Sequence, residues 1–384
     1  MLKIAVITHY FPSSAEPWQG RSAYQTLRLI AQKADVQVFY PNSSYPSILK
    51  SRSRRFTLDH SWSPPDVKTT YHDYPAIPVL SRPFNGNVAA HVLLPHVRAF
   101  APDLIFSCVL YPHGYTALKI ARALSVPCIA MAIGSDVNRI GDAISAMHTR
   151  TVLRHSDFVV TVCDDLRKKT VAMGAKPNKS RAILNGCDLG TFHVSDQLEA
   201  RRKLGIDPSF QAVVYVGRMD VKKGLRELVE AMVSLHADHP RLHAYLVGVG
   251  PDQAIIQSAI QAGDAAGYIH LLPSCTFDEV ATWMTAADVA TLPSYMEGCP
   301  NVVLEALACG RPVVATNVGG IPEILNDSCG SLVPPQDAKA LAQGLRLVLD
   351  GSWNPTEIST IHGRSWNTVA DEMLSLFQSL VPAR

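Results

Sequence analysis

The chain has 384 residues, of which 47% are hydrophobic and 18% charged, so two or three folded domains are expected and a disordered chain is excluded. Its 35 lysines and arginines face 33 aspartates and glutamates, and a net charge of +2 is too small for the broad positive field that nucleic-acid binding needs. No stretch approaches 18 consecutive apolar residues, so we expect no membrane-spanning helix.

Short apolar runs alternate with segments of helical period along nearly the whole chain, which is typical of parallel strands linked by helices. The first half predicts strands over 2–8, 35–40, 103–107, 127–131, 157–162 and 181–184, and helices near 21–33, 114–124, 143–155 and 164–173. Residues 41–90 are rich in Pro, Ser and Arg and show little period. They predict either an excursion of short elements or a mobile surface loop.

The second half repeats this design. It predicts strands near 212–216, 243–247, 268–272, 288–292, 312–315 and 331–333, and helices near 223–237, 252–263, 277–286, 301–309 and 337–350. Turn-forming residues at 185–190 separate the halves. We therefore predict an α/β fold with two Rossmann-like, doubly wound domains, 1–190 and 191–359, and a ligand between them at the carboxyl ends of the strands. The last segment, 360–384, has a helical period over 365–380 and is expected to cross back to the first domain.

The amino-terminal run and the cysteines indicate the cellular compartment in which the protein is expected to work. The run 1–8 meets His9 without a small-residue cleavage site, so we interpret it as a strand rather than a signal peptide. The eight cysteines form no C-x-x-C pair and no metal-type spacing. Buried, reduced thiols in a cytoplasmic protein are expected.

The densest functional signal is the loop and helix over 292–310. The loop carries Glu297 and Gly298, and a helix begins near Pro300, because proline is favoured in a first helical turn. The free N–H groups of that turn and the positive end of the helix dipole suit a phosphate. Glu297 and, two turns along the helix, Glu305 accept hydrogen bonds and suit sugar hydroxyls. The alternative is that both are ordinary surface carboxylates.

Two cations occupy the turn after the first strand of the second half. Residues 213–224 place Gly217-Arg218 at the end of the strand and Lys223-Gly224 at the start of the next helix. Arginine binds phosphate oxygens as a fork and lysine as a point charge, so this turn suits a diphosphate. The alternative is that both are solvated charges.

Taken in order, these motifs resemble those of the retaining glycosyltransferases of family 4, in the group that builds bacterial cell-surface polysaccharides. The resemblance rests on Gly217-Arg218 with Lys223-Gly224, the glycine turn 247–251, the Glu-x7-Glu pair Glu297 and Glu305, the run 310–323 and the turn 185–192. It implies the GT-B fold, in which two Rossmann-like domains face each other across a cleft. It also implies transfer of a hexose-type sugar from a nucleotide-diphosphate-sugar to a glycan or lipid-linked acceptor with retention of configuration.

The resemblance assigns roles to individual residues. Arg218 and Lys223 would neutralise the diphosphate, Glu297 would lie at the donor sugar and Glu305 would hold the ribose hydroxyls. The remaining donor contacts would come from Gly20, Leu272, Gly298, Cys299, Asn301 and the carbonyl of Pro300. Departure of a nucleoside diphosphate needs charge stabilisation rather than a protein nucleophile, so Arg218, Lys223 and Glu297 are the expected catalytic residues.

The first domain resembles the family more loosely. His113 stands where an acidic residue is common, and Ile133 stands where a histidine commonly contacts the transferred sugar. Asp136 and Asn138 are the alternative polar contacts, and with His113 they would line the acceptor side. Each also has a plain structural interpretation, since Asp136 suits a helix N-cap and a lone histidine is usually packed or solvated.

No cofactor and no metal ion are expected. The Asp164-Asp165 pair superficially resembles a metal-binding pair, but it opens a predicted helix, where the dipole favours acids. Lys50, Arg52, Arg54 and Arg55 form a basic segment that either binds the inner face of the cell membrane or is a solvated loop.

Two other functions remain open from the sequence. A nucleotide-sugar 2-epimerase would need the same diphosphate site together with acid and base residues for proton abstraction. A binding protein that kept the donor site and lost turnover is suggested by Ile133 and by the single glycine of the loop ending at Gly20.

Overall fold

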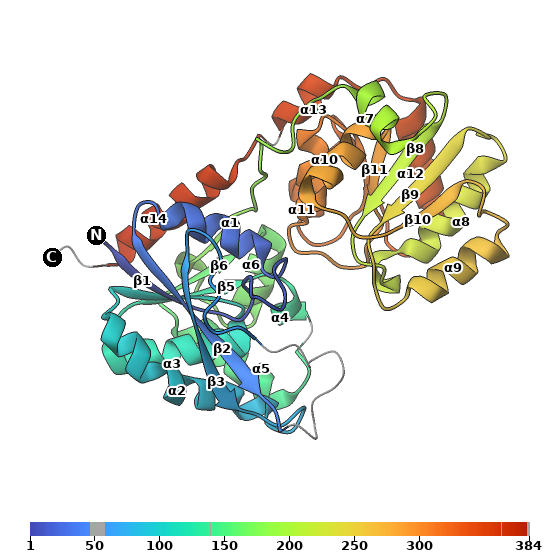
Figure 1. Ribbon diagram of the computed structural model, residues 1–384. Coiled ribbons are helices and arrows are strands. Elements are labelled where there is room, and N and C mark those ends of the chain that lie inside the picture. Colours follow the sequence, from blue (N-terminus) through green and yellow to red (C-terminus); the bar gives the residue numbers. More distant parts are fainter. Residues whose placement is uncertain (47–57, 139, 362, 382–384) are drawn as a thin grey trace. The chain divides into compact units, whose positions relative to one another are not determined.

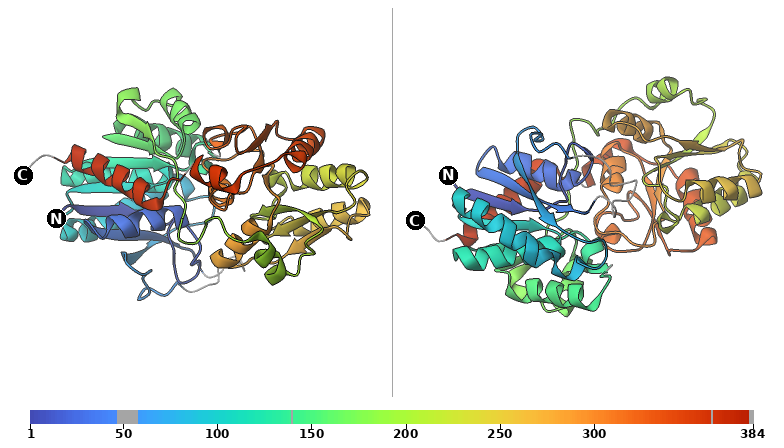
Figure 2. Two further views of the ribbon diagram at one scale, coloured as in Figure 1. Left: turned by 90° about the horizontal axis from the view of Figure 1, so that it is seen from above. Right: turned by 60° about the horizontal axis from the view of Figure 1, so that its bottom comes forward.

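The computed structural model of the chain describes residues 1–46, 58–138, 140–361 and 363–381. The chain divides into two compact units, Met1–Asn185 with Trp366–Arg384 (unit 1) and Gly186–Ser365 (unit 2). The predicted boundaries were at 190 and 359. Each unit is a parallel sheet with helices on both faces, so the prediction of two Rossmann-like domains is confirmed (Figures 1 and 2).

Unit 1 is built on a seven-stranded sheet in the order β3-β2-β1-β4-β5-β6-β7. Its strands are β1 (Lys3–Ile7), β2 (Asp35–Ser44), β3 (Lys68–Pro75), β4 (Leu104–Cys108), β5 (Cys128–Ala132), β6 (Phe158–Thr161) and β7 (Ser180–Ala182). Its helices are α1 (Arg21–Ile30), α2 (Asn85–Phe100), α3 (Tyr115–Leu124), α4 (Ser135–Asn138), α5 (Ala143–His155), α6 (Asp164–Ala172) and α14 (Trp366–Leu380), with short turns η3 (Arg82–Phe84), η4 (Leu110–Gly114) and η5 (Pro177–Lys179).

The sheet of unit 1 is buried on both faces. Along β1, Ile4 and Val6 pack with residues of α1 and α14, whereas Ala5 and Ile7 pack with residues of α2, α3 and α5. Figure 1 shows α1 and α14 on one side of this sheet and α2 and α3 on the other. A strand covered on both faces is a continuous apolar run, which is why β1 could be recognised in the sequence. The last helix, α14, packs against unit 1 as expected.

The segment 41–90 contains regular elements that its composition conceals. Strand β3 pairs in parallel with β2 along the edge of the sheet, and α2 begins at Asn85. As an edge strand, β3 alternates buried residues such as Tyr71 with more exposed ones, so its apolar pattern is weak. The first of the two predicted alternatives therefore holds for the described part. The basic residues Lys50, Arg52, Arg54 and Arg55 lie outside the described residues.

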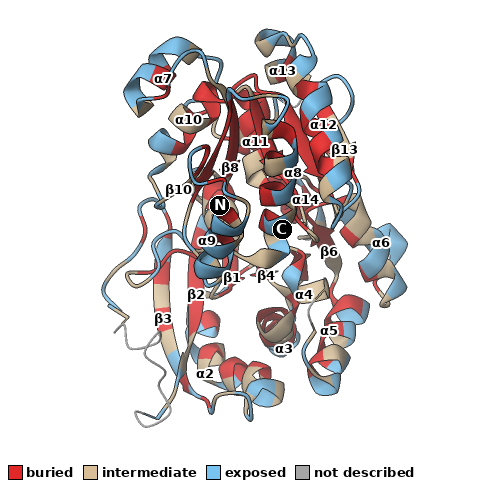
Figure 3. Ribbon diagram, turned by 90° about the vertical axis from the view of Figure 1, so that its right-hand side faces the viewer, coloured by how far each residue is buried: buried red, intermediate tan, exposed pale blue. Residues whose placement is uncertain are grey.

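Unit 2 is built on a six-stranded parallel sheet in the order β10-β9-β8-β11-β12-β13. Its strands are β8 (Gln211–Val216), β9 (Leu242–Val247), β10 (Ile269–Leu272), β11 (Val289–Leu292), β12 (Val313–Thr316) and β13 (Gly330–Val333). Its helices are α7 (Gln197–Leu204), α8 (Leu225–His236), α9 (Gln253–Ala262), α10 (Phe277–Ala286), α11 (Asn301–Ala308), α12 (Ala338–Asp350) and α13 (Pro355–Ile361), with turns η6 (Val221–Lys223) and η7 (Ile321–Glu323). The sequence predicted all six strands and the helices α8 to α12, but it did not predict α7 or α13. Figure 3 shows the strands buried.

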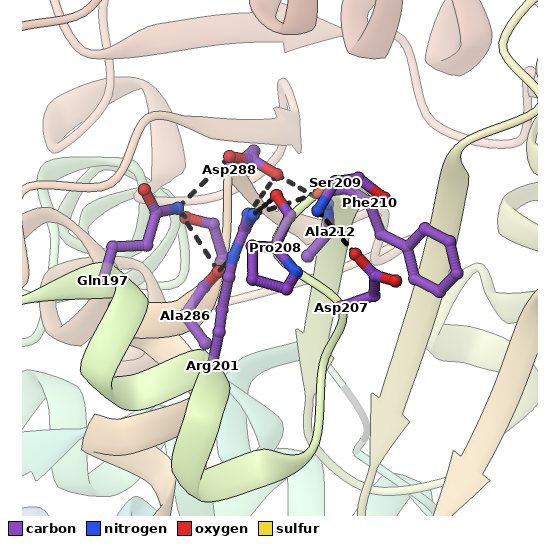
Figure 4. A network of polar contacts seen from close by, with 10 residues as sticks. Gln197, Arg201, Asp207, Pro208, Ser209, Phe210, Ala212, Ala286 and Asp288 are labelled. Carbon is purple, nitrogen blue, oxygen red and sulfur yellow. Dashed lines mark hydrogen bonds and ion pairs between the residues drawn. The ribbon is translucent and has the colours of Figure 1, made fainter.

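A buried arginine fixes the amino-terminal edge of the unit 2 sheet. Arg201 of α7 is 4% exposed, and it donates to the carbonyls of Ala286, Pro208 and Phe210 (Figure 4). Its Nη2 also lies 2.6 Å from Oδ2 of Asp288, which accepts from the N–H of Ala212 at the start of β8. Because every contact of the guanidinium is inside unit 2, Arg201 joins α7, α10 and two strands into one body.

The strand order places the candidate sites. In unit 1 the order reverses between β1 and β4, and in unit 2 between β8 and β11. Open parallel sheets bind ligands where the carboxyl ends of the strands meet such a reversal. The loops after β1, β4, β8 and β11 therefore hold the candidate ligand sites.

The two units differ strongly in charge. Unit 1 has 23 lysines and arginines against 13 aspartates and glutamates, whereas unit 2 has 12 against 20. The net charge of +2 is therefore the sum of +10 and −8. The small net charge of the whole chain is thus the sum of a basic unit and an acidic unit.

All eight cysteines are free, and all but the half-buried Cys275 are buried. Among the described residues, no helix has both the length and the apolar character that crossing a membrane requires.

Candidate active site

Two loops meet at the strand reversal of unit 2. The loop after β8 ends in η6, and the loop after β11 leads into α11. The N–H of Tyr295 donates to the carbonyl of Lys222 over 2.9 Å, which joins the loops. Gly224 lies at φ 70°, and a Cβ there would lie 1.9 Å from the carbonyl oxygen of Pro293. Only glycine permits this approach.

The joined loops bring together two residues that the sequence singled out. Nζ of Lys223 lies 2.6 Å from Oε1 of Glu297, and their side chains are 31% and 12% exposed. The sequence assigned Lys223 to a phosphate and Glu297 to a sugar, but it did not predict that they pair. A charge-assisted bond at a partly buried position holds the ammonium group in one place at the carboxyl end of the sheet.

The loop that carries Gly319 and Gly320 packs against the backbone of Glu297. Gly319, at φ 57°, is so close that a Cβ would lie 2.1 Å from the carbonyl oxygen of Glu297. The N–H of Gly320 donates to the carbonyl of Gly298 over 2.8 Å. The Gly319-Gly320 pair lies in the run 310–323 on which the resemblance rests, but no role was predicted for it. Its role here is to fix the backbone that carries Glu297 and Gly298.

Helix α11 begins at this site without a side-chain cap and without an acidic residue in its first turn. The sequence placed Pro300 inside the first turn. In the structure Pro300 precedes the helix with an extended ψ of 118°, and its carbonyl accepts from Val303 over 3.2 Å. Cys299 and Pro300 are buried, while Gly298 and Asn301 are half-buried. The positive end of this helix is therefore at the same edge as Lys223.

Arg218 reaches this edge from a turn that a buried tyrosine fixes. The phenol of Tyr215 is fully buried and donates to the carbonyl of Arg218 over 2.8 Å. Burial and then the charge of Glu297 raise the pKa of Tyr215, so the phenol stays protonated. The Arg218 side chain is exposed and has no hydrogen bond or ion pair to any described residue. The sequence did not find Tyr215, because in β8 it looks like one more core residue.

The glycine turn over residues 247–251 packs against the loop that follows β8. A Cβ on Gly248 would lie 2.0 Å from the carbonyl oxygen of Gly217, and one on Gly250 would lie 2.2 Å from that of Met219. The N–H of Gly248 also donates to the carbonyl of Leu272, over 3.0 Å, so half-buried Leu272 ends β10 beside this turn. The glycines of residues 247–251 thus let two loops touch through their backbones.

Glu305 lies further along α11 and is half-buried. Burial and then the charge of Glu305 raise the pKa of Cys187, in the turn 185–190. The structure therefore places Glu305 near Cys187.

In unit 1, the loops after β1 and β4 bring two histidines into contact. His9 follows β1, and its Nδ1 contacts Nε2 of His113 in η4. His113 is 2% exposed, and burial and then His9 lower its pKa well below the usual histidine range. The structure thus makes His113 a packed, neutral residue. The sequence missed His9, whose position directly after a strand was the available signal.

Asp136 holds two loops of unit 1 together. It lies in the first turn of α4, and its two carboxylate oxygens accept from the N–H groups of Leu110 (2.9 Å), Ile133 (3.1 Å) and Gly134 (3.0 Å). Asp136 therefore reaches back along the chain, which an N-cap does not do. Asn138 ends α4 and is half-buried.

Gly20 occupies a tight position in the same unit. It lies at φ 63°, and a Cβ would lie 2.1 Å from the carbonyl oxygen of Tyr10. The one glycine that this loop retains is thus the one that lets it touch the backbone after β1.

The carboxylates of Asp164 and Asp165 are paired with cations in α6. Asp164 contacts Arg167 (2.6 Å) and Lys168 (3.0 Å), and Asp165 contacts Lys169 (2.7 Å). The pair opens a helix as predicted.

Two family models match this chain. Residues 211–350 match the model described as glycosyl transferases group 1, and residues 19–191 match glycosyltransferase family 4. A Bacillus subtilis protein named as the teichuronic acid biosynthesis glycosyltransferase TuaC is 28% identical over 380 residues, which cover 92% of this chain and 91% of the relative. A D-inositol 3-phosphate glycosyltransferase of Geodermatophilus obscurus is 31% identical over 59% of this chain and 55% of its own length.

Solved structures share the fold over the whole chain. A sucrose-phosphate synthase from Thermosynechococcus elongatus has a TM-score of 0.82 at 22% identity, with 99% of both chains covered. Anabaena Alr3699/HepE in complex with UDP has a TM-score of 0.77 at 17% identity, with 99% of this chain and 100% of that chain covered. The same Anabaena protein was also solved in complex with UDP-glucose.

Proposed function

The chain belongs to glycosyltransferase family 4, and from that premise we propose that it moves a sugar from a nucleotide-diphosphate-sugar to a glycan or lipid-linked acceptor. We propose a hexose-type sugar, retention of configuration, and a role in making a cell-surface polysaccharide. TuaC, whose name refers to teichuronic acid, supports the class of acceptor. Both matching models are glycosyltransferases, which favours transfer over 2-epimerisation.

The observation that carries this proposal is the Lys223–Glu297 pair beside the uncapped first turn of α11. A diphosphate carries negative charge that an ammonium group, an exposed guanidinium and helix N–H groups stabilise together. In this proposal Arg218 and Lys223 bind the diphosphate, and the N-terminal turn of α11 binds its distal phosphate. Glu297 keeps Lys223 in place and accepts from sugar hydroxyls. The Anabaena protein solved with UDP-glucose supports a donor of this chemistry.

The other donor contacts remain proposals from the family. Gly298, Cys299, Pro300 and Asn301 surround the sugar and phosphate through their backbone, and Leu272 lies against the base. Glu305 binds the ribose, and Gly20 of unit 1 approaches the donor phosphate.

In unit 1 we propose that the acceptor lies near the loops after β1 and β4. Asn138 is the remaining polar side chain for this role, because Asp136 is engaged by three N–H groups and His113 is buried against His9. We also propose that the enzyme works in the cytoplasm without a metal cofactor. The proposed membrane contact of Lys50, Arg52, Arg54 and Arg55 concerns residues outside those described.

Calorimetry with UDP-, GDP- and ADP-sugars tests the donor site directly. We expect one nucleotide class to bind to the wild type and binding to be lost in the double variant Arg218→Ala/Lys223→Ala. Folded protein that binds none of these donors would refute the proposal. Product analysis with the accepted donor then tests retention, because an inverted anomer would contradict it.

A further inference from the structure

The loop that carries Glu297 is attached to the chain on both sides of Lys223. On one side, the N–H of Tyr295 donates to the carbonyl of Lys222 over 2.9 Å. On the other side, the phenol of Tyr295 donates to Oε1 of Glu227 over 2.6 Å. Glu227 lies in the first turn of α8. One tyrosine thus bonds to the chain before and after the lysine whose ammonium group pairs with Glu297.

The bond between Tyr295 and Glu227 is short and charge-assisted. Burial and the hydrogen bond to Glu227 raise the pKa of Tyr295 to about 12, so the phenol is protonated near neutral pH and donates. A hydroxyl that donates to a carboxylate forms a stronger bond than two neutral groups do. Both residues are half-buried, so water competes with this bond less than it would at an exposed position.

The stability of α8 alone does not explain Glu227. The helix dipole favours an acidic residue in a first turn, but it also favours a carboxylate that stays in water. Here Oε2 of Glu227 is buried and has no hydrogen-bond partner among the described residues. Burying a carboxylate oxygen in this way is unfavourable. A role that requires the carboxylate to face Tyr295 explains why it is kept out of water.

The other side-chain support of this turn acts before Gly224. Asp220 accepts from the N–H of Lys222 through Oδ1 over 3.0 Å, and from the N–H of Lys223 through its carbonyl over 2.9 Å. The next residue, Gly224, lies at φ 70° and has no side chain that could hold the backbone. A side-chain tie to the chain beyond this glycine therefore comes from Glu227.

We propose that Tyr295 is a positioning residue, which fixes the ammonium group of Lys223 opposite Glu297. It does so by holding Glu227, and thus the first turn of α8, against the loop after β11. The inference deepens the proposed function and rests on it for the statement that this ammonium group meets the donor diphosphate. The positioning itself is a property of the folded chain, so it can be tested without donor, acceptor or turnover.

The test is the rate at which an acylating reagent modifies Lys223 in the folded protein, measured by mass spectrometry of its peptides. An amine that pairs with a carboxylate stays protonated and reacts slowly, whereas a released amine reacts faster. Tyr295→Phe keeps the ring and removes only the hydroxyl. We expect it to raise the labelling rate of Lys223 roughly threefold or more. The exposed neighbour Lys222, measured in the same sample, should keep the wild-type rate.

Substitutions of Glu227 test the same bond from its other end. Glu227→Ala removes the acceptor and should speed the labelling of Lys223 as Tyr295→Phe does. Glu227→Gln removes the charge but keeps an oxygen that accepts from the phenol, so labelling should stay within about twofold of the wild type. The matched control is Glu230→Ala, which removes an exposed carboxylate from the same helix and should be labelled like the wild type.

A double variant separates positioning from a general loss of structure. Glu297→Gln removes the partner of Lys223 and should give the fastest labelling. If Tyr295 acts through this pair, Tyr295→Phe/Glu297→Gln is labelled no faster than Glu297→Gln. Additive effects would show that the hydroxyl only stabilises the fold, and they would overturn the proposal. Unchanged rates in the variants that circular dichroism shows to be folded would overturn it as well.

Calorimetry with the accepted nucleotide sugar separates this inference from the proposed function. The dissociation constant for the donor should rise several-fold in Tyr295→Phe, and adding Tyr295→Phe to Lys223→Ala should weaken binding no further. If no nucleotide sugar binds while the labelling rates change as expected, the proposed function fails and the positioning role stands. If the donor binds while the labelling rates do not change, the positioning role fails and the proposed function stands.

Discussion

The two units share an architecture but carry net charges of opposite sign. Unit 1 has a net charge of +10 and unit 2 of −8. A cation on unit 1 is therefore one of many, whereas Arg218, Lys222 and Lys223 stand close together in a unit where acids prevail. A positive cluster stands out against the negative charge of unit 2, so its cations are the more informative candidates for binding an anionic ligand.

Polar groups at the two strand reversals differ in the same way. In unit 2 the Lys223–Glu297 pair is partly exposed, and Arg218 has no partner among the described residues. In unit 1 His113 is buried against His9, and Asp136 accepts three backbone hydrogen bonds. Unit 2 thus presents charge at its strand ends, while unit 1 uses the equivalent polar groups to hold its own loops.

The largest expected effect tests whether unit 2 depends on its buried arginine. Arg201→Ala removes the guanidinium that pairs with Asp288 and donates to three carbonyls, and breaking such a buried pair costs about 3–5 kcal/mol. Denaturant unfolding should show this loss. Arg202→Ala, at an exposed position on the same helix, should change stability by less than about 0.5 kcal/mol. Equal effects would mean that Arg201 does not hold the sheet edge.

The second-largest expected effect is on catalysis, and it tests whether the cations of unit 2 bind the donor diphosphate. Lys223→Ala removes a cation from the proposed leaving group, and losing one such group costs about 2.7–4 kcal/mol in barrier, or roughly 100- to 1,000-fold in kcat. Steady-state rates with a saturating donor measure it. Lys222→Ala, which changes the exposed neighbour, should keep kcat within about twofold of the wild type. A fully active Lys223→Ala enzyme would remove the proposed diphosphate site.

A third prediction uses pH to test whether unit 1 keeps His113 neutral. Because burial lowers the folded-state pKa of His113, the unfolded chain binds a proton first as the pH falls below about 6.5. Stability should therefore fall by up to about 1.4 kcal/mol per pH unit for this group. His113→Gln should have a shallower slope between neutral and mildly acidic pH, whereas exposed His155→Gln should match the wild type. Unchanged slopes in both variants would contradict the buried, neutral assignment.

The smallest effect tests the support of Arg218. Tyr215→Phe removes one hydrogen bond to the carbonyl of Arg218, which is worth about 1 kcal/mol. If Tyr215 only fills the core, stability alone changes. If it positions Arg218, kcat/KM for the donor should also fall several-fold. Tyr268→Phe, on the far side of β9, should leave kcat/KM unchanged.

The sequence by itself determined the class of fold and most elements of unit 2. Strands such as β8 and β9 are buried on both faces and thus appear as continuous apolar runs, and glycines at 224, 248 and 250 mark close backbone contacts that no other residue permits. It was less informative for β3, because an edge strand beside a polar segment lacks that apolar run.

Only the tertiary structure decided how these residues meet. The Lys223–Glu297 pair, the contact of His9 with His113, and the hydrogen bond from Leu110 to Asp136 join positions far apart in the chain. No local pattern encodes such distances. The uneven charge also became visible only with the division into units, since a net value sums over surfaces that face different surroundings. Composition and periodicity follow from local physics, whereas a site depends on which loops the strand order brings together.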